Sequence, residues 1–288
     1  DVIAGIIVAI IALPLSIALA LASGVTPEKG IYTAITAGFV ISFLGGSRVQ
    51  IAGPTAAFAT IVAGIVAKNG MDGLIIATLL AGVILILMGF LRLGNLIKFI
   101  PYTITTGFTS GIAVTIFIGQ IKDFLGLTIV SEEPLIETMD KLKAVFQFIS
   151  TTNLQALLVG VISLLILILW QYLPGFCKKI PPSLIAVLVG SAMVALLNMN
   201  VNTIGDLYEI SNKLPSISLP AFSLKTVQNV LPDAFTIAIL AAIESLLSCV
   251  VADSMVNSRH RSNMELIAQG AGNITSALFG GIPATGAI

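Results

Sequence analysis

The sequence is poor in charged residues and has no excess of either sign. Charged side chains make up 10% of its 288 residues, whereas a soluble domain carries about 25%. This shortage excludes a soluble enzyme and a disordered segment, because both keep far more charge in contact with water. The 14 basic and 14 acidic residues cancel, so no net field attracts DNA, RNA or a membrane surface. We therefore expect no nucleic-acid partner.

Cysteine and histidine are also scarce. Cys177 and Cys249 are too few for a disulfide framework, and we expect both to be free thiols. His260, the only histidine, lies between Arg259 and Arg261, where we expect a solvated side chain. No spacing of ligand residues suits zinc, and no Gly-x-x-x-x-Gly-Lys nucleotide loop occurs. The sequence thus predicts no enzyme, no cofactor, no resident metal centre and no ATP-driven pump.

Apolar residues, in contrast, make up 57% of the sequence, and the mean hydropathy is +1.06. The charges separate apolar stretches, and a helix needs about 20 apolar residues to cross hydrocarbon. Several stretches are shorter and contain Gly or Pro, which is typical of the discontinuous helices of transporters. The expected spans are residues 2–22, 31–44, 54–67, 74–91, 100–121, 154–173, 184–197, 234–252 and 266–279.

Two segments differ from these spans. In residues 135–149, apolar side chains recur at helical spacing with charges between them, which predicts an amphipathic helix on the membrane interface. Residues 200–223 are polar and contain two prolines, so we expect an extended loop outside the bilayer. Among the short loops, one face carries most of the Lys and Arg, and we expect that face to be cytoplasmic. It includes all the arginines of the sequence: Arg48, Arg92, Arg259 and Arg261.

An internal repeat links the two ends of the sequence. Residues 37–46 (Ala-Gly-x3-Ser-x-Leu-Gly-Gly) recur as residues 271–281, with one added residue before the double glycine. About seven spans separate the copies, and an odd number of spans per repeat forces the second copy to enter the membrane from the opposite side. A complete protein of this kind has about 14 spans, so we expect this chain to be truncated. The sequence predicts an all-α polytopic membrane protein, part of an inverted-repeat transporter.

The segment from Gly53 to Thr55 is a candidate anion site. A short β-compatible stretch, residues 49–52, precedes it, and Pro54 suits the first position of a helix. A helix that begins at mid-bilayer has unpaired N–H groups and a partial positive charge there, and Thr55 adds a hydroxyl donor. Residues 282–287 repeat this order, so two helix starts could hold one small anion. The alternative is an ordinary helix start at the membrane surface.

Glu244 lies near the centre of an expected span, and no other ionised residue lies inside one. A carboxylate at the bilayer centre costs several kcal/mol unless it is paired, hydrated or protonated, and burial favours the protonated form. Ser248 follows one turn later on the same helix face. Together they could bind a proton or Na⁺, although a carboxyl group that only packs against a neighbouring helix is the alternative.

Five segments together resemble the SulP family of sulfate and inorganic-anion permeases. They are residues 11–32, 45–56, 107–111 with Gln120, 265–270 and 279–283. Residues 243–254 are similar to bacterial members, including cyanobacterial bicarbonate transporters. The resemblance spans essentially the whole chain.

The resemblance implies a 7+7 inverted repeat that is divided into core and gate domains, with discontinuous helices 3 and 10 preceded by short β-strands. It implies a multi-pass protein of the cell inner membrane, a homodimer when full length, and often a STAS domain after the spans. On this chain the core comprises residues 1–99, with half-helix 3 near 54–67, and 233–288, with spans 8–9 and the start of span 10. The gate comprises 100–199, and 200–232 form an extracytoplasmic linker. We expect the rest of the second repeat and any STAS domain to be absent from this chain.

The resemblance also implies the function and its residues. We expect secondary-active transport of a small inorganic anion, of the sulfate or bicarbonate class, by alternating access in the lipid bilayer. A glutamate at position 244 resembles proton-coupled members, which favours proton symport. The alternatives are a Na⁺-coupled bicarbonate symporter and an uncoupled anion channel or exchanger. The anion positions carried over are Thr55, Ala56, Gly286 and Ala287, and those for the coupling ion, H⁺ or Na⁺, are Glu244 and Ser248.

Overall fold

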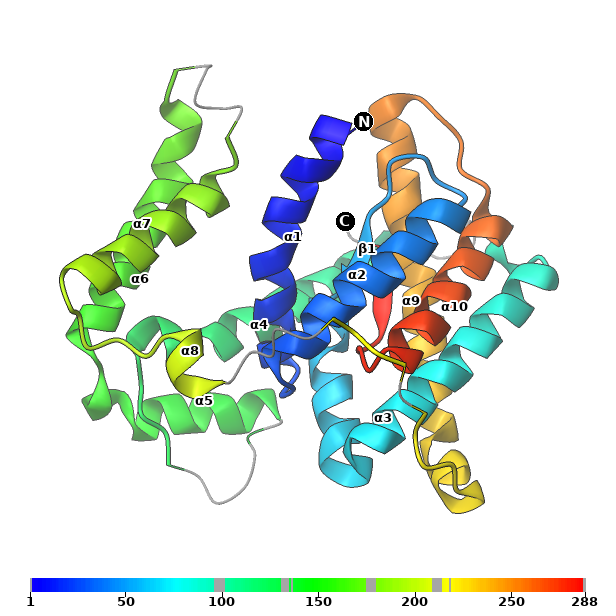
Figure 1. The fold of residues 1–288 in the computed structure, drawn as a ribbon, viewed down its shortest axis with the longest axis horizontal. Coiled ribbons are helices and arrows are strands. Elements are labelled where there is room, and N and C mark those ends of the chain that lie inside the picture. The colour runs from blue at the N-terminus through cyan, green and yellow to red at the C-terminus, as the bar shows by residue number, and fades with distance from the viewer. Residues whose placement is uncertain are drawn as a thin grey trace. The chain divides into compact units, whose positions relative to one another are not determined.

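The computed structural model is dominated by helices (Figure 1). It describes residues 2–95, 102–130, 135, 137–174, 180–208, 214–217 and 219–286. The helices are α1 (Val2–Ala22), α2 (Pro27–Leu44), α3 (Ala59–Phe90), α4 (Tyr102–Leu125), α5 (Thr138–Gln147), α6 (Leu154–Leu169), α7 (Pro182–Leu196), α8 (Ile204–Leu207), α9 (Leu224–Val256) and α10 (Ser262–Leu278). Shorter elements are strands β1 (Ala52–Pro54) and β2 (Ala284–Gly286) and the 3₁₀ turns η1 (Ala56–Phe58), η3 (Ile149–Thr151) and η4 (Trp170–Tyr172).

Most expected spans correspond to helices. In the described part of the chain, four helices are long and apolar enough to cross a bilayer: Ala4–Ala22, Ala56–Phe90, Leu154–Tyr172 and Leu224–Val256. The second of these covers most of two expected spans, 54–67 and 74–91. Gly70 separates them with φ of 67° and ψ of −174°, a conformation that breaks the helix and that glycine adopts without strain. The long apolar helix is therefore two helices that meet at Gly70.

Three local expectations need correction. Pro54 does not begin a helix: it ends β1, and Thr55 is the cap of the following turn, because its hydroxyl accepts the Ala57 N–H at 3.3 Å. The expected extended loop 200–223 contains α8, which is closed by a capping box between Thr203 and Asp206. The Thr203 donors hold the pKa of the Asp206 carboxyl below its ordinary value. The amphipathic helix is shorter than residues 135–149, since α5 ends at Gln147 and η3 follows.

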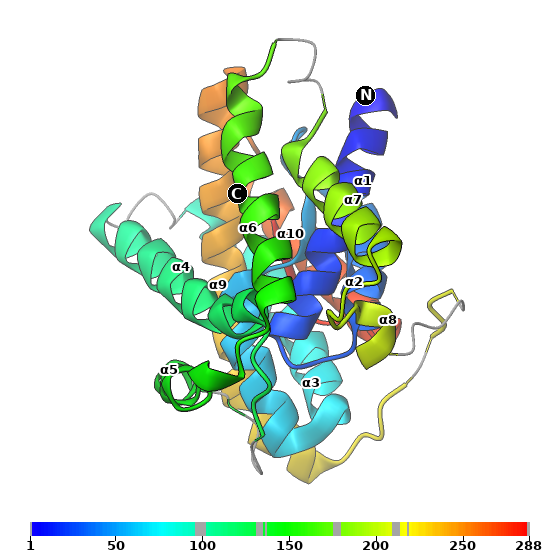
Figure 2. The same cartoon turned by 90° about the vertical axis from the view of Figure 1, so that its left-hand side faces the viewer.

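The chain divides into two compact units. The first comprises residues 1–11 and 113–209, and in it α6 packs against α7 (Figure 2). Asn153 caps α6, because its side chain accepts the N–H groups of Gln155 and Ala156, and it also donates to the Asn200 carbonyl at 2.7 Å. The boundaries of the units fall inside α1 and α4. The assignment of residues to core and gate domains stays a prediction.

The second unit comprises residues 12–112 and 210–288. Here α3 packs against α9 and α10, and α10 also packs against α2 (Figure 1). Thus α2 and α10, which carry the repeated segment of the sequence, contact each other. The α3–α10 contact depends on glycine: a Cβ on Gly82 would lie 2.7 Å from the Gly270 carbonyl oxygen, and one on Gly270 would lie 2.5 Å from that of Gly82. Such small residues let helix backbones approach closely.

The one sheet in the described residues has two short strands. β1 and β2 are antiparallel, with Ala52 opposite Gly286, Gly53 opposite Thr285 and Pro54 opposite Ala284. The extended segment before η1 and its counterpart in the repeat are therefore hydrogen-bonded neighbours. This pairing joins two parts of the sequence that are far apart.

We expect Gly82→Ala to destabilise the protein, because the new methyl group would meet backbone atoms of α10 that cannot move aside. Overpacking of this kind costs about 1–3 kcal/mol, so the midpoint of thermal unfolding in detergent should fall. Gly64→Ala is the matched control on the same helix, since a Cβ there has nothing within 4 Å. Equal midpoints for the two variants would contradict the close α3–α10 packing.

Candidate functional site

The candidate site centres on a hydrogen bond between a helix start and the middle of α9. Thr55 donates its hydroxyl proton to Glu244 Oε1 over 2.7 Å. The same hydroxyl accepts the Ala57 N–H, so it connects the first turn of η1 with the carboxyl group. The Thr285 side chain, on β2, also interacts with this carboxyl group. Both halves of the repeat therefore converge on Glu244.

The two carboxyl oxygens of Glu244 differ in their hydrogen bonds. Its Oε1 accepts the Thr55 hydroxyl, while Oε2 is buried and has no hydrogen-bond partner among the described residues. A buried carboxyl oxygen without a partner is costly, which is typical of a functional position rather than of a packing residue. Ser248 lies one turn further along α9 and is 4% exposed. The two predicted coupling-ion residues therefore lie on one face of α9.

At the start of η1, the backbone offers a donor. Ala56 is the first residue of the turn, and its N–H has no acceptor in the part of the chain that the structure describes. The residue is half-buried, and the start of a helix carries a partial positive charge. Thr55 and Ala56 thus combine a hydroxyl group and an unpaired amide beside Glu244.

Gly286 lies close to this position but belongs to β2, not to a helix. Its N–H donates to Ser245 Oγ over 3.0 Å, so the predicted ligand amide already has an acceptor. Gln50 donates to the Ser245 carbonyl over 3.1 Å and fills the space where a side chain on residue 286 would lie. A side chain at residue 286 would therefore require Gln50 to move. Ala287 lies outside the described residues, and the roles of both residues in anion binding stay predictions.

Side chains of α10 and α2 hold the second extended segment. Asn273 donates to the Ala284 carbonyl at 2.8 Å and accepts the Ala284 N–H at 2.9 Å, as a neighbouring strand would. Ser276 donates to the Ile282 carbonyl at 2.7 Å, and the Ile282 N–H donates to Thr33 at 2.7 Å. Irregular backbone inside a membrane requires such internal partners.

Sequence reasoning missed these supporting residues. Gln50, Ser245 and Asn273 are uncharged, and among uncharged polar residues the sequence analysis singled out only Thr55 and Ser248. Asn273, fully buried, lies in the expected span 266–279, and treating buried amides as costly would have identified it.

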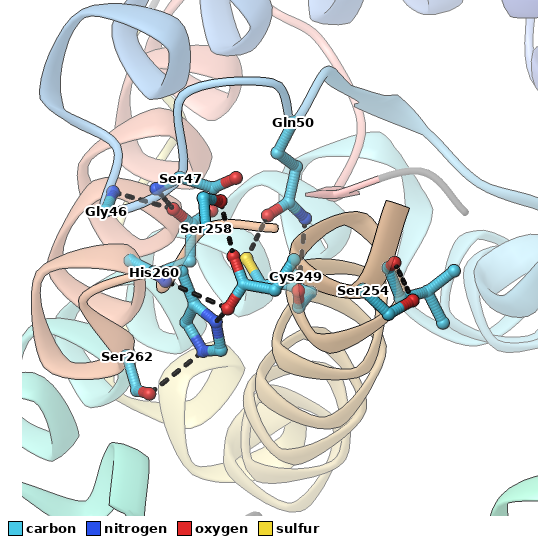
Figure 3. A network of polar contacts seen from close by, with 12 residues as sticks. Gly46, Ser47, Gln50, Cys249, Ser254, Ser258, His260 and Ser262 are labelled. Atoms are coloured by element: carbon cyan, nitrogen blue, oxygen red, sulfur yellow. Dashed lines mark hydrogen bonds and ion pairs between the residues drawn. The ribbon is translucent and has the colours of Figure 1, made fainter. Parts of the chain in front are cut away.

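One further expectation about a polar residue is wrong. His260 is not solvated: its ring is 8% exposed and contacts Asp253 at 2.7 Å (Figure 3). The search for ionised residues inside the expected spans also missed Glu265, one position before the span 266–279, which lies inside α10 with 0% exposure and accepts the N–H groups of Gly46 and Ser47. Both residues bind partners that local sequence does not indicate. Cys249 is a free, buried thiol as expected, and Cys177 lies outside the described residues.

Comparison with known proteins places these features in a family. The sequence model of the sulfate permease family matches residues 1–288. The putative sulfate transporter YvdB of Bacillus subtilis is 44% identical over 100% of this chain and 54% of its own length. The bicarbonate transporter BicA of Picosynechococcus is 34% identical over 100% of this chain and 51% of its own length. The chain spans about half the length of these curated relatives.

Solved structures agree with the sequence matches. The transmembrane domain of a cyanobacterial bicarbonate transporter BicA has a TM-score of 0.83 and 32% identity, and the match covers 98% of this chain and 72% of that one. SLC26A9 has the same fold, with a TM-score of 0.82 at 20% identity over 97% of this chain and 47% of its own. The predicted fold class, a helical membrane protein that forms part of a 7+7 transporter fold, is confirmed. The chain belongs to the sulfate permease family, as its sequence motifs indicated.

Proposed function

We propose that the protein is a secondary-active transporter of a small inorganic anion, of the sulfate or bicarbonate class, with a proton as the coupling ion. The observation that carries the proposal is the 2.7 Å hydrogen bond from Thr55 to Glu244 at the start of a helix. Relatives that are named sulfate and bicarbonate transporters support the substrate class. The helical membrane fold supports a location in the cell inner membrane.

The anion would bind at the start of η1. Ala56 offers an N–H without an acceptor in the described chain, and the adjacent helix start supplies about half a positive charge. Gly286 gives its N–H to Ser245 and Thr285 donates its hydroxyl proton to the Gly286 carbonyl, so we expect a contact from the second repeat to come from Ala287. A site built from partial charges suits a small anion that must also be released.

The Thr55 hydroxyl could couple the binding of a proton to the binding of the anion. Its hydroxyl has one proton, and that proton is donated to Glu244. When Glu244 takes up a proton, its own O–H can donate to Thr55, and the Thr55 proton becomes free to bind the anion. Protonation also removes a like charge, and two unit charges 4 Å apart interact by about 4 kcal/mol at an effective dielectric constant of 20. Proton and anion would therefore bind together.

A Na⁺-coupled transporter is the second candidate, and one observation favours it. Glu244 Oε2 has no hydrogen-bond partner among the described residues, and Ser248 lies one turn away. A carboxylate oxygen and a hydroxyl are oxygen ligands of the kind that Na⁺ binds. An uncoupled channel or exchanger would need the helix start but not the carboxyl group.

Alternating access would move the core residues 1–99 and 233–288 against the gate residues 100–199. The division of the chain into two compact units supports such a movement, since each unit packs within itself. The complete protein would act as a homodimer.

We expect Glu244→Gln to abolish concentrative uptake but to preserve passive anion exchange, because an amide keeps the hydrogen bond to Thr55 and cannot exchange a proton. The full-length protein is reconstituted in proteoliposomes, and uptake of labelled sulfate and bicarbonate is measured under imposed proton or Na⁺ gradients. Asp72→Asn, at an exposed position on α3, is the control. Gradient-driven uptake by Glu244→Gln would refute the coupling role. Uptake that follows only the Na⁺ gradient in the wild type would favour Na⁺ coupling.

We expect Thr55→Val to weaken anion binding, because valine has the shape of threonine but no hydroxyl. Loss of one hydrogen bond to a charged group costs about 1.5–3 kcal/mol, which corresponds to an increase in KM of about ten- to 150-fold. Thr55→Ser keeps the hydroxyl and should remain within about threefold of the wild type. The measurement is the concentration dependence of uptake, with thermal unfolding as a check on folding. A KM that is unchanged in Thr55→Val would exclude the hydroxyl as an anion ligand.

A further inference from the structure

A second polar region lies where α2, α9 and α10 begin or end, away from Thr55 and Glu244. Two cavities there, of about 750 and 620 Å³, share the lining residues Arg259, His260 and Arg261. Arg48 lines the second cavity, and the first extends to Asn95, beyond the end of α3. We call these two adjacent cavities together the arginine pocket. All of its lining residues belong to the second compact unit.

The arginine pocket is lined by three arginines and one carboxylate, that of Asp253. Arg48, Arg259 and Arg261 are exposed, and none of them forms an ion pair within the described residues. The sequence has four arginines, and three of them line this pocket, whereas none of the lysines that the structure describes does.

Asp253 supplies the one carboxylate among the lining residues, and this carboxylate already forms hydrogen bonds. It accepts the hydroxyl of Ser258 at 3.0 Å, the backbone N–H of His260 at 2.9 Å and the His260 ring at 2.7 Å (Figure 3). Asp253 therefore offsets part of the charge, and in the described residues its ion-pair partner is His260, not an arginine. The pocket keeps a net positive charge.

Hydrogen bonds fix the segments that carry the arginines. The N–H groups of Gly46 and Ser47 donate to Glu265 Oε2 at 2.8 and 3.2 Å, and the Arg261 N–H donates to the Gly46 carbonyl at 3.0 Å. A Cβ on Gly46 would lie 2.2 Å from the Arg261 carbonyl oxygen, so the two loops touch. Arg48 and Arg261 are consequently held on neighbouring, well-fixed backbones.

The buried His260 ring orients the other loop. It bonds Asp253 on one side and Ser262 Oγ, at 2.9 Å, on the other (Figure 3). The flanking residues, Arg259 and Arg261, are exposed while His260 is turned inward. Two guanidinium groups are thus presented together beside the first turn of α10, whose N–H groups add a partial positive charge.

We propose that the arginine pocket binds a phosphate group, either that of an anionic lipid headgroup or that of a soluble phosphate ester. Guanidinium groups bind phosphate through paired hydrogen bonds, which a lysine cannot provide. The cavities are far larger than a single inorganic anion needs and match the size of typical ligand pockets. The pocket also lies at the ends of membrane helices, where basic clefts receive lipid headgroups. The proposal uses none of the residues assigned to transport.

The test compares two triple variants of the full-length protein that lose the same charge. Arg48→Gln/Arg259→Gln/Arg261→Gln removes the guanidinium groups, and Lys68→Gln/Lys122→Gln/Lys225→Gln removes three exposed lysines outside the pocket. One arm measures binding of phosphatidylglycerol in nanodiscs against a phosphatidylcholine background. The other arm measures binding of ATP and of pyrophosphate in detergent.

We expect the arginine variant to bind at least one of these probes about tenfold more weakly than the wild type, and the lysine variant to stay within about twofold. Loss in the lipid arm alone assigns a headgroup, and loss in the soluble arm alone assigns a free phosphate ester. Arg48→Lys/Arg259→Lys/Arg261→Lys keeps the charge and should bind with intermediate affinity. If the glutamine variant of the arginines fails to fold, this charge-preserving variant is compared with the wild type in its place. Equal binding by the arginine and lysine variants in both arms overturns the proposal.

Discussion

The pairing of β1 with β2 is the contact on which the candidate site depends. Inside hydrocarbon, extended backbone needs a partner for every N–H and C=O group, because water is absent. The two strands supply partners for each other, and Asn273 supplies both a donor and an acceptor to Ala284. This pairing holds the start of η1 beside the middle of α9, so that Thr55 reaches Glu244. A helix can therefore begin beside a carboxyl group while the extended backbone that precedes it stays hydrogen-bonded.

The helices were largely predictable, because their signal is local. Apolar length alone predicted the bounds of α1, and the repeated segment identified α2 and α10, which contact each other. Local pattern predicted a β-compatible stretch at residues 49–52 but not the exact bounds of β1, Ala52–Pro54, or its pairing with β2. Pro54 has the properties of a helix start, yet it ends a strand, since the Thr55 hydroxyl serves as the cap. The choice between these roles depends on a partner strand more than 200 residues away in the sequence.

The candidate site was predictable in its residues but not in its contacts. Glu244 was identifiable because a carboxyl group in an apolar span is costly, whereas its bond to Thr55 joins positions 189 residues apart. His260 and Glu265 show the same limit, because their contacts could not be predicted from the sequence either. His260 was expected in solvent because arginines flank it. Its ring instead lies inside the protein, where it bonds Asp253, a residue one turn before the end of α9. Glu265 is buried because backbone amides of another loop surround it. Charge along the sequence does not reveal such partners.

The two proposed anion sites use different kinds of positive charge, and the difference follows from what each must do. A transport site has to release its anion, so binding must be favourable enough for entry and weak enough for exit. A helix start with about half a charge, next to a carboxyl group that regains its negative charge when its proton leaves, meets both demands. Formal charges on three arginines would hold a small anion more firmly than transport allows. They are suited to a phosphate group that stays bound, and fixing their loops through Glu265 and His260 lowers the entropy lost on binding. Arginines are therefore expected at a site that retains its anion. An unpaired backbone N–H, such as that of Ala56, is expected at a site through which the anion is transported.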